Sequence, residues 1–335
     1  MGQRANLITV EDGEHTLRYD HWVANRLDDI LFWGADYALS YFDAQETVGE
    51  DGWLDEIWAE GGAVLDLDKR HLLWWGGEDV NHELPVRRVY LKLQKKVWHD
   101  WTIEWAHRGI VDLAECIGLP KEKVLSHREN LSSAVQLKMP EKKTWVKTLG
   151  GIETASGETK LFPLLGEAED YLRNGTSLVN QCHREEGLRK LNWEGWEENG
   201  EFPRGGFLIN EKHKMVEFWQ VRDCPNVVED MKRLWEDWDV VWHQDDYEFQ
   251  SKKLKGKVVL PEINETEIIE RLRGNLLRED GKLGIESALV TNEVLRNEGM
   301  SVEINPWLFK SHHVINPLET KQQIWQKAFG ELENK

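Results

Sequence analysis

The chain has 335 residues, of which 40% are hydrophobic and 18 are tryptophan, and its formal net charge is -19. This length suits about two domains, and the apolar content excludes an intrinsically disordered acidic chain. The negative charge repels phosphate backbones and anionic lipids, so it argues against general nucleic-acid binding and membrane binding and favours a basic protein as partner.

The sequence gives no sign of export, disulfide bonding or a bound cofactor. Its three cysteines, Cys116, Cys182 and Cys224, include no Cys-x-x-Cys pair, so neither a disulfide framework nor a zinc site is expected. The opening has only a short apolar run, and no stretch reaches the roughly 20 apolar residues of a membrane-spanning helix. We expect a cytoplasmic protein without a cofactor, since the common glycine-rich nucleotide motifs are absent.

Four elements are predicted within the first 105 residues. A hairpin over residues 5–22 turns at an Asp-Gly pair, and a second hairpin over 61–75 joins two short apolar strands through a charged turn. A helix over 86–97 follows a proline and places its basic residues, Arg87 among them, on the solvated side. A strand over 101–105 comes next, because its apolar side chains alternate with period two.

The same elements recur further along the chain. Residues 61–75 align without gaps with 205–219, and both segments begin with Gly-Gly. The pattern Trp-x-x-Trp-x-x-x-Trp at 98–105 recurs at 235–242, again after a helical segment. A weaker match predicts a further hairpin over 148–165. We interpret these matches as an internal duplication.

The alternation of hairpins with helices predicts an α+β fold with antiparallel sheets and helices on one side of each sheet. The predicted domains are a first repeat over residues 1–135, a second repeat over 143–257 and a mainly helical C-terminal appendage over 260–335. The packing of the two repeats and the oligomeric state are left open. Helices are expected within the appendage at residues 265–277, 284–298 and 321–329.

Tryptophans at matching positions of the two repeats are expected to fill the core. Aromatic side chains bury a large apolar area, so at matching positions of a duplicated sheet they are normally core residues. The alternative is that they form stacking platforms for a base or a sugar ring. The residues concerned are Trp101, Trp105, Trp238 and Trp242.

Two pairs of residues are weak candidates for chemistry. Asp20 and His21 combine a carboxylate with an imidazole, the common groups of acid–base catalysis. Neighbouring residues of a strand point to opposite faces, however, so Asp20 orients His21 only if the chain turns there. Asp66 and Asp68 lie on one strand face and are the candidate metal ligands, because paired carboxylates bind divalent cations. The alternative for Asp20 and His21 is a turn or an edge-strand pair, and the alternative for Asp66 and Asp68 is a solvated strand or turn.

Three stretches carry a resemblance to a known group of proteins. They are the opening MGQRAN, the YDHW motif at 19–22 and WLDEIWAEGG at 53–62. Together they resemble an uncharacterised family of bacterial cytoplasmic proteins, and the likeness covers residues 1–118. The resemblance implies a bacterial, cytosolic origin and no particular activity.

Two functions are compatible with the sequence. The first is an acidic intracellular binding protein, an inhibitor or immunity-type factor that neutralises a basic protein such as a toxin, a phage protein or a host effector. Residues 1–85 carry 19 acidic against 5 basic side chains, and concentrated charge speeds the encounter with such a partner. Its candidate partner-binding residues are Asp51, Asp55, Glu56 and Glu60. The alternative is a hydrolase acting on a nucleotide or similar small molecule in a cleft between the repeats.

Overall fold

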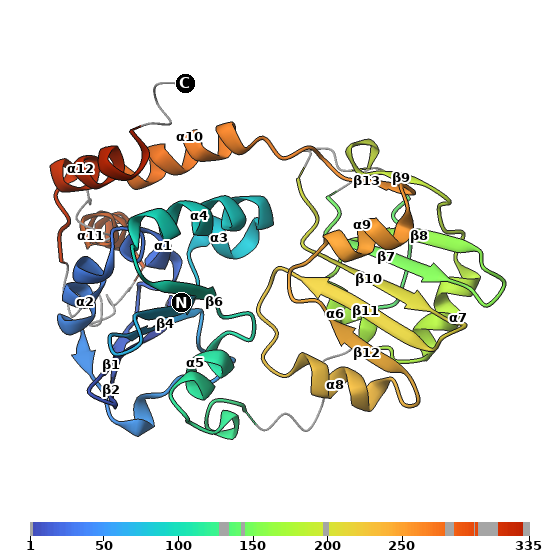
Figure 1. Ribbon diagram of the computed structural model, residues 1–335, viewed down its shortest axis with the longest axis horizontal. Helices are drawn as coiled ribbons and strands as arrows, with labels where there is room; N and C mark the ends of the chain where they lie inside the picture. Colours follow the sequence, from blue (N-terminus) through green and yellow to red (C-terminus); the bar gives the residue numbers. More distant parts are fainter. Residues whose placement is uncertain are drawn as a thin grey trace. The chain divides into compact units, whose positions relative to one another are not determined.

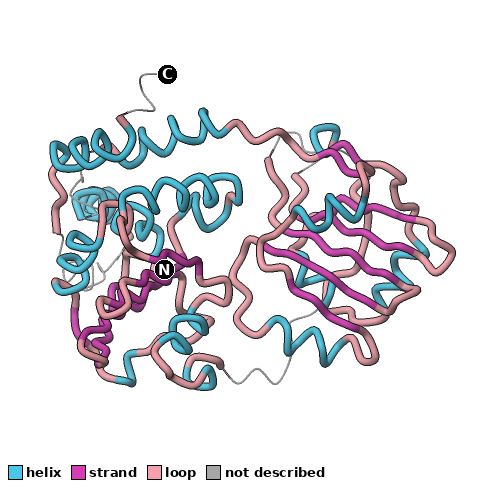
Figure 2. The backbone as a smooth tube through the Cα atoms, viewed as in Figure 1, coloured by secondary structure: helices cyan, strands magenta, loops and turns pink. Residues whose placement is uncertain are grey.

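The computed structural model describes the chain in seven segments and divides it into two compact units (Figure 1). Unit 1 consists of the ranges Met1–Val80, Val86–Ser126 and Glu265–Lys335. Unit 2 consists of the ranges Asn81–Pro85 and His127–Asn264. The described residues are 3–126, 134–141, 145–196, 201–278, 285–297, 299–300 and 314–330. Each unit contains one multi-stranded sheet with helices, so the fold is α+β as predicted (Figure 2).

The sheet of unit 1 has six strands in the order β3-β2-β1-β4-β5-β6. The hairpins β1–β2 and β4–β5 are antiparallel, whereas β1 pairs in parallel with β4, and β5 pairs in parallel with β6. Both predicted hairpins and the predicted strand after the helix are therefore confirmed. The strands are β1 (Ala5–Glu11), β2 (Glu14–Asp20), β3 (Glu46–Thr47), β4 (Gly61–Asp66), β5 (His71–Trp75) and β6 (Thr102–Trp105).

The main sheet of unit 2 has five strands in the order β8-β7-β10-β11-β12. This order and the relative strand directions are those of β2-β1-β4-β5-β6 in unit 1. A two-stranded sheet pairs β9 with β13 in parallel. The strands are β7 (Thr148–Glu153), β8 (Thr159–Leu164), β9 (Leu191–Asn192), β10 (Gly205–Asn210), β11 (Met215–Gln220), β12 (Asp239–Trp242) and β13 (Val258–Val259).

Both sheets are mixed, so the prediction of antiparallel sheets is right only for the hairpins. The connection between the first two hairpins contains helices and returns the chain to the end of the sheet where β1 begins. The first strand of the second hairpin therefore runs in the same direction as β1, which is the usual outcome of a long crossover connection. A shorter link would have produced an antiparallel neighbour.

Helices cover both faces of the sheet in unit 1. On one face Tyr41 in α2 donates a hydrogen bond to Asp20, and on the other Leu113 in α5 packs closely against Gly62. The α-helices of this unit are α1 (Leu27–Ile30), α2 (Ala35–Asp43), α3 (Glu78–His82), α4 (Leu84–Val97), α5 (Ile110–Cys116), α10 (Glu265–Leu276), α11 (Ile285–Asn297) and α12 (Leu318–Phe329). Its short 3-10 helices are Ala24–Arg26, Glu50–Gly52 and Lys121–Lys123.

Two helices from the end of the chain complete the core of unit 1. Leu272 and Leu276 of α10 join the same buried cluster as the sheet residues, and so do two aromatic residues of α12. Trp325 of α12 stacks on Phe32, with ring centroids 6.0 Å apart. The predicted C-terminal helices are thus present, and the described parts of α10 and α12 pack on unit 1.

The sheet of unit 2 is also covered on both faces. Phe207 and Ile209 of β10 point into a core with the three helices of one face, whereas Leu208 between them packs with Phe249 on the other face. The expectation of helices on one side only is therefore wrong, because alternate side chains of this strand are apolar in both directions. The helices are α6 (Ala168–Leu172), α7 (Ser177–Arg184), α8 (Val227–Leu234), α9 (Glu248–Leu254) and the 3-10 helix Trp193–Gly195.

The repeated tryptophans are less buried than predicted. Of the four expected core residues, Trp105 is buried, while Trp101, Trp238 and Trp242 are half-buried. The deepest indoles are instead the first of each pattern, Trp98 and Trp235. The strands that follow them, β6 and β12, are edge strands of their sheets. Trp101, Trp238 and Trp242 therefore remain partly open to solvent. No helix among the described residues is long and apolar enough to cross a membrane.

Candidate functional site

The loop of residues 50–60, which we call the acidic loop, connects β3 to β4 and exposes two adjacent large apolar side chains. Ile57 is 52% exposed and Trp58 is 54% exposed, more than any other described tryptophan. An exposed tryptophan next to a second apolar side chain is a composition often found at the centre of protein–protein interfaces. Three carboxylates of the same loop are also exposed: Glu50, Asp51 and Glu60.

Two other carboxylates of the acidic loop hold its shape. Asp55 Oδ1 accepts hydrogen bonds from the backbone N–H groups of Ile57 and Trp58, at 2.9 and 3.0 Å. The Glu56 carboxylate accepts from the N–H and the hydroxyl of Ser126, at 2.7 and 2.6 Å. Asp55 and Glu56, two of the four predicted partner-binding residues, are thus hydrogen-bonded within the protein. They fix the backbone that presents Ile57 and Trp58.

Arg4, at the start of β1, holds the Trp58 side chain. Its guanidinium lies 4.6 Å from the centre of the Trp58 ring, and its backbone N–H donates to Glu60 Oε2 at 3.0 Å. A cation over an exposed indole contributes about 0.5–1 kcal/mol. The ring is therefore oriented before any partner arrives. The Glu60 carboxylate is thus also bound to Arg4. The Asp51 side chain, by contrast, forms no hydrogen bond or ion pair with another described residue.

The candidate catalytic pair is divided between the two faces of the sheet. Asp20 Oδ2 accepts from the Tyr41 hydroxyl at 2.9 Å, and Oδ1 accepts from the Trp22 N–H at 2.7 Å. His21 Nδ1 lies instead 2.6 Å from the Tyr19 hydroxyl. Burial, together with the nearby Arg4 charge, lowers the pKa of His21, so the imidazole is neutral at pH 7. The carboxylate and the imidazole have different partners, as strand alternation requires.

The candidate metal ligands close two turns. The Asp66 carboxylate accepts from the backbone N–H and from Nζ of Lys69, both at 2.9 Å. Burial raises the pKa of Asp66, but these bonds more than offset it and the pKa lies below its usual value. Asp68 accepts from the N–H groups of Asp12 and Gly13 in the first hairpin turn, at 2.9 and 2.8 Å. Among the described residues, no three His, Cys, Asp or Glu side chains are grouped as a metal site.

The cysteines offer no nucleophile. All three are unpaired; Cys182 and Cys224 are buried and Cys116 is half-buried. Burial raises the pKa of Cys182 to about 12 and that of Cys224 well above its usual value. Since the thiolate is the reactive form, both thiols are inert at neutral pH.

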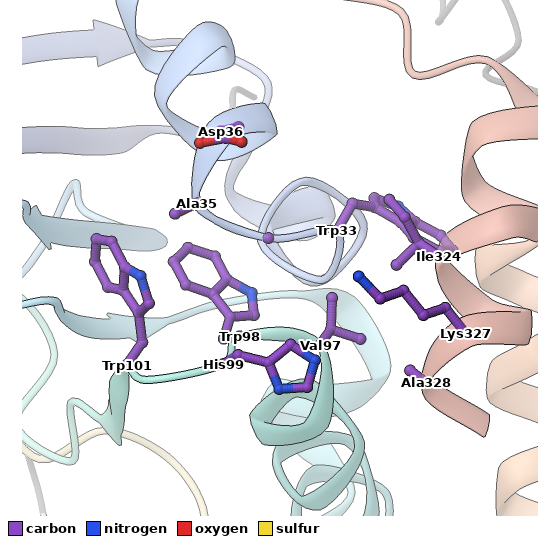
Figure 3. A pocket seen from close by; sticks show the side chains of 11 residues that line it. Trp33, Ala35, Asp36, Val97, Trp98, His99, Trp101, Ile324, Lys327 and Ala328 are labelled. Atoms are coloured by element: carbon purple, nitrogen blue, oxygen red, sulfur yellow. The ribbon is translucent and has the colours of Figure 1, made fainter.

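A cavity of about 330 Å³ lies within unit 1, between α2, the turn after α4, and α12 (Figure 3). Three indoles form much of its wall, and its charged or titratable side chains are Asp36, His99 and Lys327. Figure 3 shows Asp36 on the α2 side and Lys327 extending from the α12 side. The remaining lining residues are Trp33, Gly34, Ala35, Val97, Trp98, Trp101, Ile324 and Ala328.

The turn after α4 places two of these indoles at right angles. Asp100 adopts a positive φ of 62°, which reverses the chain between Trp98 and Trp101. The two rings meet edge to face, with centroids 5.1 Å apart and an interplanar angle of 78°. The Trp98 N–H donates to the carbonyl of Leu31 at 2.8 Å, so this ring is fixed. The result is a rigid aromatic corner that opens into the cavity.

Sequence reasoning missed the residues that matter most in both places. Neither the exposure of Ile57 and Trp58 nor the approach of Arg4 follows from local periodicity, although an apolar pair among acidic residues in WLDEIWAEGG is a signal for an exposed anchor. Lys327 reaches the cavity only because a helix from the end of the chain packs on unit 1. Comparisons of the chain with protein-family models, curated proteins and solved structures give no match.

Proposed function

We propose that the protein is an acidic intracellular binding protein that captures a basic protein through the acidic loop, acting as an inhibitor or immunity-type factor. The observation that supports it is the exposed pair Ile57 and Trp58 beside exposed carboxylates. A tryptophan surrounded by polar groups is the usual composition of an interface hot spot. The carboxylates match the charge of a basic partner.

The fixed geometry of the loop supports the role of Trp58 as an anchor. A tryptophan side chain presents up to about 250 Å², so covering the exposed 54% removes roughly 135 Å² from water. At about 25 cal/mol per Å² this contributes about 3 kcal/mol to binding. Because Asp55 and Arg4 already hold the loop and the ring, little conformational freedom is lost on association.

The charge of the same part of the chain supports fast encounter. Residues 1–85 have a net charge of -14, from 19 acidic and 5 basic side chains. Such a surface attracts a basic partner over a distance set by the screening length, which falls from about 10 Å at 0.1 M salt to about 4–5 Å at 0.5 M. Association should therefore slow steeply as salt is added.

The test uses binding kinetics with a basic protein that co-purifies with the full chain. Trp58→Ala should raise the dissociation rate about 10- to 100-fold, because the anchor is lost. Asp51→Lys should lower the association rate more than it raises the dissociation rate, since Asp51 is exposed and its side chain forms no hydrogen bond or ion pair with a described residue. Glu262→Lys changes an exposed acid of unit 2 and is the matched control.

The outcome that contradicts the proposal is equally defined. If the association rate does not respond to salt between 0.05 and 0.5 M, or if Asp51→Lys and Glu262→Lys behave alike, the negative charge serves solubility alone. If Trp58→Ala leaves the dissociation rate unchanged, the acidic loop is not the contact surface. The hydrolase hypothesis stays a prediction, and no contact among the described residues favours it.

We also infer that the two units arose by internal duplication. The shared strand order supports this origin, and so do matching details at the same place in each unit. In unit 2, Asp237 has the φ of 62° found at Asp100, and the Trp235 N–H donates to Leu172 O at 2.9 Å as the Trp98 N–H does to Leu31 O. An experimental structure with different strand orders in the two units would refute it.

A further inference from the structure

We propose that the cavity between α2, the turn after α4, and α12 is a binding site for a small planar aromatic molecule that carries a single negative charge, such as an aromatic monocarboxylate. The site goes beyond the binding function proposed above, because no residue of the acidic loop lines it. Its volume of about 330 Å³ stands at the small end of the range for ligand pockets.

One indole of the wall, Trp101, supplies a partly open aromatic surface. Trp33 and Trp98 are almost fully buried, and their N–H groups are already used, by Asp29 Oδ1 at 3.3 Å and by Leu31 O at 2.8 Å. These two indoles are thus held in place by their hydrogen bonds and expose little surface to the cavity. Trp101 is half-buried and packs edge to face against the fixed ring of Trp98, so it is the indole on which a planar ligand ring would stack.

The polar groups select a negative charge. Lys327 is exposed, extends toward the cavity in Figure 3, and has no carboxylate partner among the described residues. His99, which is exposed, is a second nitrogen-bearing side chain of the lining. The Lys327 ammonium would pair with an anionic group of the ligand while the rings hold the body.

Asp36 limits how much negative charge the site accepts. Its carboxylate lines the same cavity on the α2 side, opposite the α12 side that carries Lys327 (Figure 3). A ligand with one charge at one end places that charge near Lys327 and away from Asp36. A doubly charged phosphate monoester gains the same contact with Lys327 but feels stronger repulsion from Asp36. The geometry thus favours a monocarboxylate over a phosphate.

The experiment measures binding of three matched probes to the full chain by titration calorimetry: 2-naphthoate, 2-naphthamide and 2-naphthyl phosphate. We expect 2-naphthoate to bind about tenfold more tightly than the neutral amide and more tightly than the phosphate. Lys327→Met should remove the advantage of naphthoate over naphthamide and leave the affinity for naphthamide unchanged. Lys95→Met changes an exposed lysine of α4 outside the cavity and should have no effect.

A second variant tests the aromatic wall. Trp101→Ala should weaken all three probes about tenfold or more, as loss of a stacking surface does, provided that its circular dichroism spectrum matches that of the wild type. Equal affinity for naphthoate and naphthamide, or naphthoate binding that Lys327→Met does not change, would overturn the proposal. Tighter binding of the phosphate would overturn the assignment of a single charge. None of these results bears on Trp58 or the acidic loop.

Discussion

Asp28→Asn is expected to stabilise the protein at neutral pH but not at acid pH. Asp28 lies in α1, where burial and the adjacent Asp29 charge raise the pKa of its carboxyl from 3.8 to about 7. Between about pH 4 and pH 7, the Asp28 carboxyl therefore keeps its proton in the folded protein and loses it in the unfolded chain. Because the folded state binds more protons in this window, the free energy of unfolding falls as the pH rises through it.

The size of the effect follows from the shift. Each pKa unit corresponds to about 1.4 kcal/mol, so a rise from 3.8 to about 7 lowers the free energy of unfolding by about 4 kcal/mol above pH 7. Because Asp28 is half-buried and part of the shift comes from the charges of Asp29 and Asp79, we expect the loss in the free energy of unfolding to be about 2–4 kcal/mol. Asparagine is neutral at every pH and escapes this loss.

The assay is urea unfolding at pH 4, 5.5 and 8 for the wild type and for Asp28→Asn. The variant should match the wild type at pH 4 and exceed it by about 2–4 kcal/mol at pH 8. Asp51→Asn removes an exposed acid without a structural contact and should follow the wild type throughout. A difference between Asp28→Asn and the wild type that is the same at pH 4 and pH 8 would refute the reasoning.

Two further substitutions test the packing of unit 1. Trp98→Phe should lower the free energy of unfolding by about 2–3 kcal/mol, because Trp98 is buried and the loss of its N–H leaves the Leu31 carbonyl without this donor. Trp101→Phe should lower it by less than about 1 kcal/mol. Denaturant melts that rank the two variants in the opposite order would contradict this expectation. Lys321→Met should lower the free energy of unfolding by about 3 kcal/mol, because it removes a buried cation 3.2 Å from Asp29 Oδ1. Adding Asp29→Asn should restore part of this stability in the same melts. A double variant that is less stable than Lys321→Met alone would argue against a buried pair.

Much of each sheet is predictable because its hairpins are specified locally. The turn at Asp12 and Gly13 has a positive φ at both residues, which an Asp-Gly pair adopts at low cost. The Gly-Gly starts of β4 and β10 and the tryptophan pattern after each helix likewise mark elements whose residues are close in sequence. Pairings between distant strands have no such local signal, so the parallel contacts of β1 with β4 and of β5 with β6 were not predicted.

Helical periodicity fails where a long polar side chain finds buried partners. The pattern of residues 86–97 predicts that Arg87 is solvated, yet it is fully buried. Its Nε donates to the carbonyl of Val80 at 3.0 Å, and its guanidinium lies 4.1 Å from the centre of the Trp105 ring. Both partners come from elements before and after α4, so only the tertiary structure shows that the charge is accommodated.

The candidate sites were harder to predict than the sheets, and for a related reason. The cavity depends on α12, more than 200 residues beyond Trp98 and Trp101 in sequence, and on Lys327 within it. The acidic loop depends on Arg4 and Ser126, which lie far from the loop in sequence. The sequence does place a cluster of acidic residues at 50–60, but it does not tell which carboxylates face solvent.

The distribution of the carboxylates narrows the source of electrostatic steering. Several acids of residues 1–85 are used inside the protein: Asp20 by Tyr41, Asp43 by Arg18, Asp29 by Arg26 and Lys321, Asp55 and Glu56 within the acidic loop, and Asp66 and Asp68 in turns. The ion pairs cancel most of a carboxylate's field at a distance, whereas hydrogen bonds from neutral groups fix the side chain and leave its charge in place. Glu50 and Asp51 are exposed and have no such contact with a described residue. They precede Ile57 and Trp58 in the acidic loop, so exposed charge lies in the same loop as the exposed apolar pair, and Glu14, Glu46 and Glu78 add exposed charge elsewhere in residues 1–85.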